Sequence, residues 1–530
     1  VCINTVESAR LSSAAATTGF NAVTIVRVAE ATIEDGDFEG NQEAIDALEK
    51  IVSKKAYSAS IDIDGTTPYG HVNATFTRHE SSDDTIVFKI NNTNDEEFFK
   101  YIESLNDADY EKVFSSVTNG NSFYTYTNNG TLINIAYLPL EKTVTISKET
   151  VTNLPANLST PSYNKANNSS ITQIKLADDI SIKEGMSYVI HLEDGTFFII
   201  DGGWCEDNYL EADKLYNTLV GLAGEGNDIV IAGWIFTHCH GDHIGTFNYF
   251  VEKYHDSVTI NQLLYNFPSD DDILASASAY MITKNTKQRY LYFREMIATH
   301  LQDTEIVKLH SGYKFYYGNA EIEILQTFED LYPLTVANYD YNSSSTIFTV
   351  TINGQRMLFV GDADYEAATR LNTTYGATLK SDFVQVAHHG LNTSGPIKTM
   401  YQYADAEYVF YPAPMAWYEA NLTANANYYL THESMTVKQV FISGAQTFKI
   451  ELPYAGTLYD GKKFPATDLK TEKYDRVDRP EGTVTVPTAF FDLEFQNGVA
   501  VNAGTSKDTA TVTMTGGSIK ETTVKFNGEE

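Results

Sequence analysis

The chain has 530 residues, of which 42% are hydrophobic, and it carries a formal net charge of -33 at pH 7. This length predicts about three domains, and the apolar fraction is sufficient for folded cores. So large an acidic excess repels polyphosphate, and it therefore argues against a stable nucleic-acid partner.

Residues 1–165 are predicted to form an α+β accessory domain followed by a linker. Apolar side chains at helical spacing indicate a first helix at 41–54, and a second helix is expected at 96–105. Asn128, Asn129 and Gly130 favour a tight hairpin turn. Alternating polar and apolar residues indicate half-exposed strands at 58–64, 71–78 and 84–90. The Pro-, Asn- and Ser-rich residues 153–170 are predicted to be the linker.

Residues 170–465 are predicted to form the main domain. Strand patterns at 171–176 and 186–200 open it, and Asp201 follows the second of these strands. Helices are expected at 209–220, 287–300 and 366–371. Strand pairs that alternate with covering helices predict the α/β (α+β) class and, within it, an αββα sandwich.

The most informative motif is FTHCHGDHIG at residues 236–245, directly after the apolar run 229–236. His238 and His240 lie two apart on a strand end and therefore project to the same side, and Asp242 and His243 open the next helix. Imidazoles and a carboxylate suit zinc, and a site without thiolates leaves positions open for water. The motif therefore predicts a catalytic metal centre, whereas Cys239 is expected to point away and to pack.

Two later apolar strands also end in candidate ligands. MLFVGDAD at 357–364 delivers Asp362, and FVQVAHHG at 383–390 ends in His388 and His389. Each motif alone is equally typical of an ordinary turn. Because α/β sheets place ligands at the carboxyl ends of their strands, the ordered occurrence of all these motifs indicates one shared site.

The HxHxDH pattern and these later motifs resemble the metallo-β-lactamase hydrolase superfamily. The resemblance implies the αββα fold and two zinc ions, with Mn²⁺ or Fe as alternatives. It implies that Asp362 bridges the ions and that Asp201, which begins the DGG after a strand, orients the ligand loop. The implied metal ligands are His238, His240, Asp242, His243, Asp362, His388 and His389.

Residues 342–345, the GDAD motif and VAHHG followed by Thr393 and Ser394 resemble one branch of that superfamily. The branch comprises the hydrolase domain of bacterial competence (DNA-uptake) channels and the choline-phosphate esterases of the cell surface. It implies hydrolysis of a phosphoester or phosphodiester. In the uptake-channel relatives a further histidine precedes a helix, and His432 is the candidate counterpart, with an ordinary surface histidine as the alternative.

The chain departs from the superfamily pattern between His243 and Asp362. His255, His300 and His310 fall in this interval, but none has the strand-end setting of a ligand. We therefore expect the first metal to be completed by His388, His389 or His432, or to bind weakly.

The predicted chemistry follows from two metal ions bridged by Asp362 and a solvent molecule. Such a pair lowers the pKa of the bound water from about 15.7 toward roughly 7 and so makes a metal-bound hydroxide available. The candidate catalytic residues are Asp242, His388 and His432. Whichever of His388 and His389 is not a ligand is expected to stabilise the oxyanion or to protonate the leaving group.

Residues 480–530 are predicted to form a β-rich segment, either the start of a lectin-like jelly roll or strands docked on the hydrolase domain. The 3 cysteines are too few for a disulfide framework, and no apolar run reaches the roughly 20 residues of a transmembrane helix. The acidity and the high Asn, Ser, Thr and Tyr content resemble exported proteins of Gram-positive bacteria. An extracellular or cell-surface location is therefore expected.

These observations predict a secreted, multidomain, zinc-dependent phosphodiesterase or phosphoesterase. Its substrate is expected to be a small molecule or a cell-envelope polymer. The alternatives are a lactonase or β-lactamase-type acyl hydrolase, and a surface binding protein with a structural metal site. The intact HxHxDH motif with Asp362 favours an enzyme, because a vestigial site would be expected to lose ligands.

Overall fold

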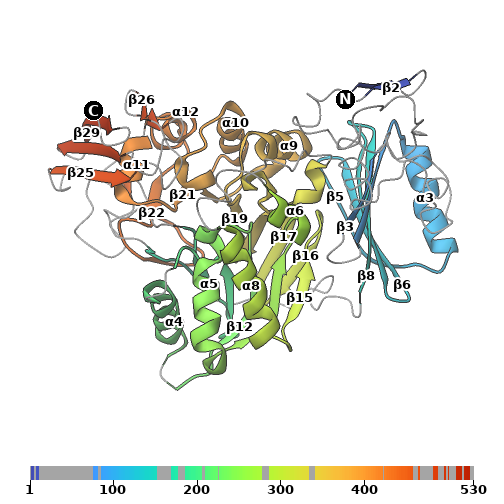
Figure 1. Ribbon diagram of the computed structural model, residues 1–530, viewed down its shortest axis with the longest axis horizontal. Coiled ribbons are helices and arrows are strands. Elements are labelled where there is room, and N and C mark those ends of the chain that lie inside the picture. The colour runs from blue at the N-terminus through green and yellow to red at the C-terminus, as the bar shows by residue number, and fades with distance from the viewer. Residues whose placement is uncertain are drawn as a thin grey trace.

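Two β-sheets packed face to face, with helices on both outer sides, form the centre of the protein in the computed structural model (Figure 1). The structure describes residues 85–151, 169–176, 185–205, 209–224, 226–276, 286–332, 341–421 and 423–456. It also describes short strands at 2–4, 8–10, 76–80, 464–465, 482–487, 495–496, 499–500, 509–515 and 518–525. The predicted helix at 41–54, the predicted strand at 58–64 and most of the predicted linker lie outside these residues.

The first central sheet combines an antiparallel edge with a parallel half. Its strands, in spatial order, are β15 (Glu305–Lys308), β14 (Gln262–Tyr265), β12 (Val230–Ile235), β11 (Phe197–Ile200), β10 (Tyr188–His191), β9 (Ser170–Gln173) and β23 (Phe448–Glu451), with β13 (Thr259–Ile260) beside β12. The strands from β11 to β15 are parallel, so their carboxyl ends meet at one edge of the sheet.

The second central sheet is built in the same way. Its strands, in spatial order, are β16 (Lys314–Tyr317), β17 (Ala320–Gln326), β18 (Ile347–Ile352), β19 (Gln355–Phe359), β20 (Phe383–Gln385), β21 (Tyr408–Tyr411), β22 (Gln439–Ile442) and β24 (Phe464–Pro465). The strands from β19 to β24 are parallel. Here too, the carboxyl ends of neighbouring strands lie side by side.

Helices cover both outer faces of this pair of sheets. Three of them, α4 (Leu210–Ala223), α5 (Gly241–Tyr254) and α8 (Thr286–His300), pack on the first sheet. The second sheet is covered by α9 (Tyr365–Tyr375), α10 (Gly395–Ala404), α11 (Met415–Asn421) and α12 (Asn425–Tyr428). A further short helix, α6 (Asp270–Ala275), precedes α8.

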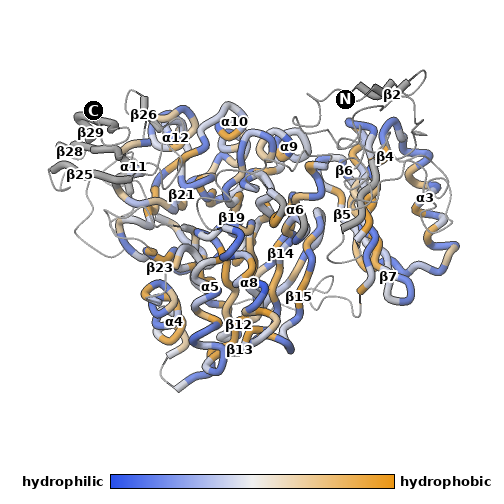
Figure 2. The backbone as a smooth tube through the Cα atoms, viewed as in Figure 1, coloured by the Kyte–Doolittle hydropathy of each residue, from blue (hydrophilic) through white to orange (hydrophobic). Residues whose placement is uncertain are grey.

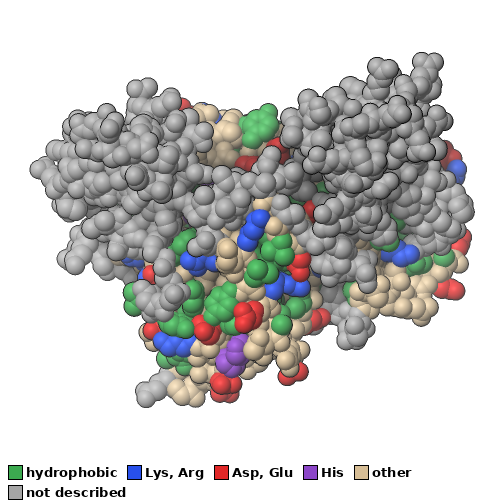
Figure 3. Space-filling model, viewed as in Figure 1, with side chains coloured by type: hydrophobic (Ala, Val, Ile, Leu, Met, Phe, Trp, Pro, Cys, Tyr) green, Lys and Arg blue, Asp and Glu red, His purple; other side chains and the backbone are tan. Residues whose placement is uncertain are grey.

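Apolar side chains explain this layering. Tyr188 of the first sheet packs against Phe359 and Phe410 of the second, inside a core that both sheets share. Separate apolar clusters join each sheet to its helices. The sheet strands are accordingly largely orange in Figure 2, whereas acidic and basic side chains appear on the outer face in Figure 3. The predicted αββα sandwich is confirmed.

In the described residues of the N-terminal part, an antiparallel sheet carries a helix on one face. Its strands, in spatial order, are β3 (Phe76–Glu80), β4 (Thr85–Asn91), β8 (Thr143–Thr150), β7 (Thr131–Leu138), β6 (Asn121–Asn128) and β5 (Glu111–Thr118). The helix α3 (Asp95–Asp107) buries Phe98, Tyr101 and Leu105 against this sheet, which confirms the helix expected at 96–105. Asn129 and Gly130 adopt φ angles of 47° and 81°, as the predicted hairpin turn requires.

Buried charges join the N-terminal sheet to the central domain. The His310 ring lies between Glu149 of β8, with Nε2 3.1 Å from Oε1, and Glu329, with Nδ1 2.7 Å from Oε2. Lys308 lies 3.3 Å from Glu329. Burial would lower the pKa of His310, but the carboxylates of Glu329 and Glu149 outweigh it and raise the pKa to about 10. His310 is therefore a protonated cation at neutral pH that holds the two parts together.

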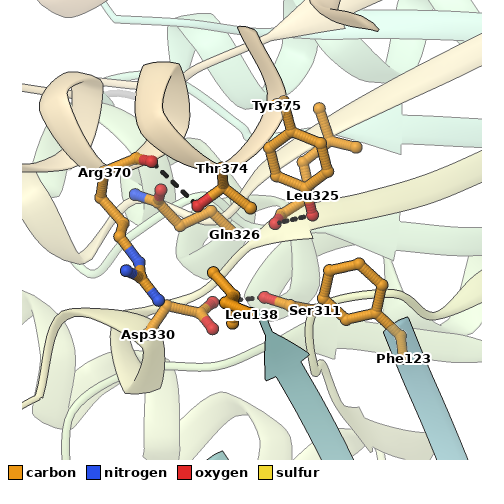
Figure 4. A pocket seen from close by; sticks show the side chains of 9 residues that line it. All are labelled: Phe123, Leu138, Ser311, Leu325, Gln326, Asp330, Arg370, Thr374 and Tyr375. Carbon is orange, nitrogen blue, oxygen red and sulfur yellow. Dashed lines mark hydrogen bonds between the residues drawn. The ribbon is translucent and has the colours of Figure 1, made fainter. Parts of the chain in front are cut away.

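A small cavity lies at the same junction (Figure 4). Phe123 and Leu138 line it from the N-terminal sheet, and Leu325, Arg370 and Tyr375 line it from the central domain. Its volume of about 10 Å³ is room for about one water molecule. It is too small for a substrate, and none of the predicted metal ligands lines it.

Replacement of His310 by glutamine is expected to destabilise the protein by about 3 to 5 kcal/mol at pH 7, because two buried carboxylates lose their shared cation. The folded pKa of His310 lies above the ordinary histidine value of 6.5, so the stabilisation that His310 contributes is present below pH 6.5 and is lost as the pH rises through about 10. The thermal midpoints of wild type and His310→Gln should therefore converge between pH 7 and pH 10. His191→Gln, on β10, is the control, and a constant difference across this range would contradict the expectation.

At the two ends of the chain, the structure describes short strands. At the C-terminal end, β25 (Gly482–Pro487), β28 (Thr509–Thr515) and β29 (Ser518–Lys525) pair, and β26 (Phe495–Gln496) pairs with β27 (Val499–Ala500). At the N-terminal end, β1 (Cys2–Asn4) pairs with β2 (Ser8–Arg10). The predicted domain boundaries and the jelly-roll interpretation stay predictions. In the described part of the chain, no helix has both the length and the apolar character to cross a bilayer.

Candidate metal centre

The ends of four parallel strands place the predicted site residues at one edge of the sandwich. Asp201 follows β11 and the His238 loop follows β12 in the first sheet. Asp362 follows β19, and the His388–His389 pair follows β20, in the second sheet. Because the two sheets face each other, residues more than one hundred positions apart meet in one cluster, as the contacts of His238 with Asp362 and of His389 with Asp242 show.

A first group of ligand atoms comes from Asp242, His243, Asp362 and His389, and all of these atoms lie within 4.8 Å of one another. His389 Nε2 lies 3.3 Å from Asp242 Oδ2 and 3.5 Å from Asp362 Oδ2. His243 Nε2 lies 3.2 Å from Asp362 Oδ1. All four side chains are buried. Two imidazoles and two carboxylates therefore surround a single point.

A second group comes from His238, His240 and Asp362, whose ligand atoms also lie within 4.8 Å of one another. His238 Nε2 lies 3.7 Å from Asp362 Oδ2. Asp362 therefore belongs to both groups, which is the position of a bridging carboxylate. Among the residues that the structure describes, no further His, Cys, Asp or Glu joins this second group.

The hydrogen bonding of the cluster fits a bound cation. Several buried ligand atoms of the two groups have no hydrogen-bond partner among the described residues: His238 Nε2, Asp242 Oδ1, His243 Nε2, Asp362 Oδ1 and His389 Nε2. Each such atom costs about 1 to 3 kcal/mol unless it is satisfied. Because they converge on the same two points and are all metal-ligand atoms, these residues fit one or two divalent cations.

The electrostatics keep the carboxylates in their ligand form. Burial would raise the pKa of Asp362, but the imidazoles of His243 and His389 hold it well below its usual range. Burial would lower the pKa of His243, but Asp362 and Asp201 outweigh it and raise the pKa to about 10 in the absence of a metal, so a cation that binds Nε2 displaces a proton from it. Both carboxylates of the first group are therefore ionised at neutral pH, as metal binding requires.

Asp201 and a backbone carbonyl orient two of the imidazole rings. Asp201 accepts hydrogen bonds from Thr237 N and Thr237 Oγ1, both at 2.7 Å, and from His243 Nδ1 at 2.6 Å. His389 Nδ1 donates to Pro412 O at 2.8 Å. Each bond fixes the proton on Nδ1, so that the Nε2 lone pair faces the cluster. Asp201 is thus a positioning residue for His243.

The backbone after β20 separates the roles of the two adjacent histidines. His388 and His389 adopt positive φ angles of 47° and 51°, which turns their side chains apart. The His389 ring is buried in the first group, whereas the His388 side chain is 23% exposed, with Nε2 3.8 Å from Asp362 Oδ2. His388 belongs to neither group of ligand atoms.

The structure does not bring every predicted site residue to the cluster. His432 is exposed, and its ring stacks on Tyr428 with the centroids 4.5 Å apart. It belongs to neither ligand group, and His389 serves the first group, so none of the three candidate histidines completes the group of His238 and His240. Cys239 packs in the apolar core, where burial raises the pKa of its thiol to about 12.

Sequence reasoning gave Ser345 and Thr237 no role in the site, although residues 342–345 were part of the resemblance. Ser345 Oγ accepts a hydrogen bond from Asp362 N at 3.0 Å, donates to Asn342 O at 2.8 Å and lies 3.4 Å from His238 Nδ1. A Cβ on Gly361 would lie 2.8 Å from both Ser345 Oγ and Thr237 Cβ, so only glycine fits before Asp362. Thr237 directly precedes the HxHxDH motif, and Ser345 lies in the serine run before β18, but neither is a ligand type that spacing would single out.

Comparisons with known proteins agree with this fold. Residues 183–395 match the family model described as the metallo-beta-lactamase superfamily. No curated protein sequence matches the chain. The competence-channel and choline-phosphate branch stays a prediction.

Several solved structures are similar to parts of the chain. CmlA, a diiron beta-hydroxylase from Streptomyces venezuelae, is 13% identical with a TM-score of 0.27, over 47% of this chain and 45% of CmlA. The short form of human tRNase Z is 13% identical with a TM-score of 0.26, over 46% of this chain and 90% of its own. Zinc-bound PqqB from Methylobacterium extorquens is 9% identical with a TM-score of 0.25, over 41% of this chain and 71% of PqqB. The chain thus spans about half the length of CmlA.

Proposed function

We propose that this chain, whose residues 183–395 match the metallo-β-lactamase superfamily, is a metal-dependent hydrolase of phosphoesters or phosphodiesters. The observation that carries the proposal is the pair of ligand groups that share Asp362. One group offers four ligands and the other three, so the second leaves a coordination position open. Open positions distinguish catalytic from structural metal sites.

Different residues of the site have different roles in such a reaction. Divalent cations held here would supply Lewis-acid chemistry, by acidifying water and by taking up negative charge in the transition state. Asp362 holds the two ligand groups at a fixed separation, and Asp201 fixes the ring of His243. His388 is the one imidazole of the cluster that is both near Asp362 and partly exposed. We assign it the proton transfer to the leaving group.

The position of Arg289 is a second observation that favours an anionic substrate. Its guanidinium stacks on the ring of Trp204 at 4.1 Å and donates from Nη1 to Cys205 O at 2.8 Å. A Cβ on Gly241 would lie 2.4 Å from Arg289 Cδ, so this side chain packs directly on the residue between His240 and Asp242. In a chain with a net charge of -33, an arginine beside the ligand loop favours recognition of phosphate.

The proposal is tested by metal analysis together with three substrates. Purified full-length protein is expected to contain zinc or another transition metal and to hydrolyse bis-p-nitrophenyl phosphate or p-nitrophenyl phosphorylcholine faster than nitrocefin. Turnover of nitrocefin alone would indicate an acyl hydrolase instead. Bound metal without turnover of any of the three would indicate a binding protein with a structural metal. We also propose an extracellular or cell-surface location, which the strongly acidic composition supports.

Replacement of His388 by glutamine is expected to lower kcat by about 100-fold or more for an alkyl phosphoester, because the departing alkoxide needs a proton. A p-nitrophenyl ester should lose much less, since p-nitrophenolate leaves without one. Metal content should stay unchanged. His432→Gln is the matched control and should alter neither rate. Loss of metal from His388→Gln, or an equal loss of rate with both leaving groups, would contradict the assignment.

A further inference from the structure

Two histidines outside the catalytic cluster meet where α5 and α8 end. His255 directly follows α5, and His300 is the last residue of α8. Their ring centroids lie 4.0 Å apart, and His300 Nδ1 lies 3.2 Å from His255 Nε2. Figure 3 shows histidine at the lower surface of the molecule, with acidic side chains nearby. The proposed hydrolysis does not use this pair.

The two rings are arranged as a chelating pair. His255 Nδ1 donates to Val251 O at 2.9 Å, which fixes the ring and leaves the lone pair on Nε2. Two imidazole nitrogens that bind one tetrahedral zinc at 2.0 to 2.1 Å lie roughly 3.3 Å apart. The observed separation of 3.2 Å, which is a hydrogen bond between the rings, is close to this value, so a metal ion can replace the shared proton once the two rings turn toward it.

The surroundings of the pair favour a cation. Asp256 Oδ1 lies 3.5 Å from His255 Nε2, and its side chain is 94% exposed and so can turn toward a third coordination position. Two helix C-termini converge here, and their last carbonyls carry partial negative charge. The His255 side chain is 26% exposed, so an ion and its remaining water ligands have access from solvent.

We propose that His255, His300 and Asp256 form a separate binding site for a divalent transition metal such as zinc, nickel or copper. Through His255 and His300, the bound ion links the C-terminal end of α5 to the C-terminal end of α8. At its other end, α5 carries Asp242 and His243, and Arg289 near the start of α8 packs on Gly241. The 14 residues of α5 separate the two sites by about 20 Å. A metal at the distal site therefore stiffens the helix pair that carries catalytic ligands.

The test uses the full chain with zinc supplied only in the amount that gives full hydrolysis, so that the catalytic centre is filled and the distal site is not, and Cu²⁺ as the probe. The wild type is expected to bind one further Cu²⁺, whose electron paramagnetic resonance spectrum shows two nitrogen ligands. His300→Gln should weaken this binding at least about tenfold, while bound zinc and hydrolysis in the absence of copper stay unchanged. His191→Gln, which alters an unrelated histidine, should bind Cu²⁺ as the wild type does.

A milder variant keeps the result independent of folding. Asp256→Asn leaves both imidazoles in place and should weaken Cu²⁺ binding by less than His300→Gln does. Failure of the wild type to bind additional Cu²⁺, or equal binding by His300→Gln, would show that the pair is an ordinary hydrogen bond between rings. Because zinc content and turnover are measured on the same samples, this failure is distinct from a failure of the proposed hydrolase function.

Discussion

Replacement of Asp362 by alanine is expected to abolish hydrolysis and to remove most of the bound metal. Asp362 contributes to both ligand groups, and its carboxylate lies 3.2 Å from His243, 3.5 Å from His389 and 3.7 Å from His238. Its loss therefore weakens two cation sites at once. The effect should exceed the roughly 100-fold loss that follows removal of a residue that only orients a ligand.

The measurement is metal content by mass spectrometry beside the rate with the better phosphoester substrate. Asp364→Ala is the matched control, because Asp364 lies two residues further on and caps α9 through Glu366 N at 3.0 Å and Ala367 N at 3.3 Å. It should cost about 1 kcal/mol of stability and leave metal and rate intact. An Asp362→Ala protein with full metal and full rate would overturn the bridging role and, with it, the proposed site.

Replacement of Asp201 by asparagine is expected to weaken metal binding by about 10- to 100-fold while the ligands themselves stay in place. The Asp201 carboxylate is fully buried and accepts three hydrogen bonds, two from Thr237 and one from His243. An amide cannot accept all three, because its nitrogen is a donor. The ring of His243 therefore loses its fixed orientation, and the lone pair on Nε2 no longer faces Asp362.

A metal titration separates this positioning role from a ligand role. Asp201→Asn should regain most of its hydrolytic rate at saturating metal, since His243 is still present, whereas Asp362→Ala should not. The pH dependence of metal binding should also change, because the Asp201 carboxylate contributes to the raised pKa of the metal-free His243. Wild-type metal affinity in the Asp201→Asn protein would show that the carboxylate supports only the fold of the loop.

The fold was predictable because its signals are local. Apolar runs such as 229–236 become buried strands, and segments between such runs become α4, α8 and α9. For the same reason, the arrangement of the side chains in the HxHxDH loop could be predicted from the sequence. His238, His240, Asp242 and His243 lie within six positions, so one strand end and one helix start determine where they point.

The division of roles between His388 and His389 was beyond local reasoning. Adjacent histidines look equivalent in a sequence, and only the two successive positive φ angles after β20 bury one ring and leave the other partly exposed. The role of Ser345 could not be predicted for a related reason. It reaches His238 and Asp362 because η6 (Asn342–Ser344) brings the start of β18 against the ligand loop.

By itself, the sequence determined the strands, the covering helices and which residue types are able to bind a metal, since each of these depends on neighbours a few positions away. Only the tertiary structure decided which distant groups meet. The sharing of Asp362 by two ligand groups depends on how the two sheets face each other. The meeting of His255 with His300, and of His310 with Glu149, depends on the packing of elements 45 and 161 positions apart in the chain. Contacts of that kind are set by the burial of apolar surface across the whole molecule, which no short stretch of sequence encodes.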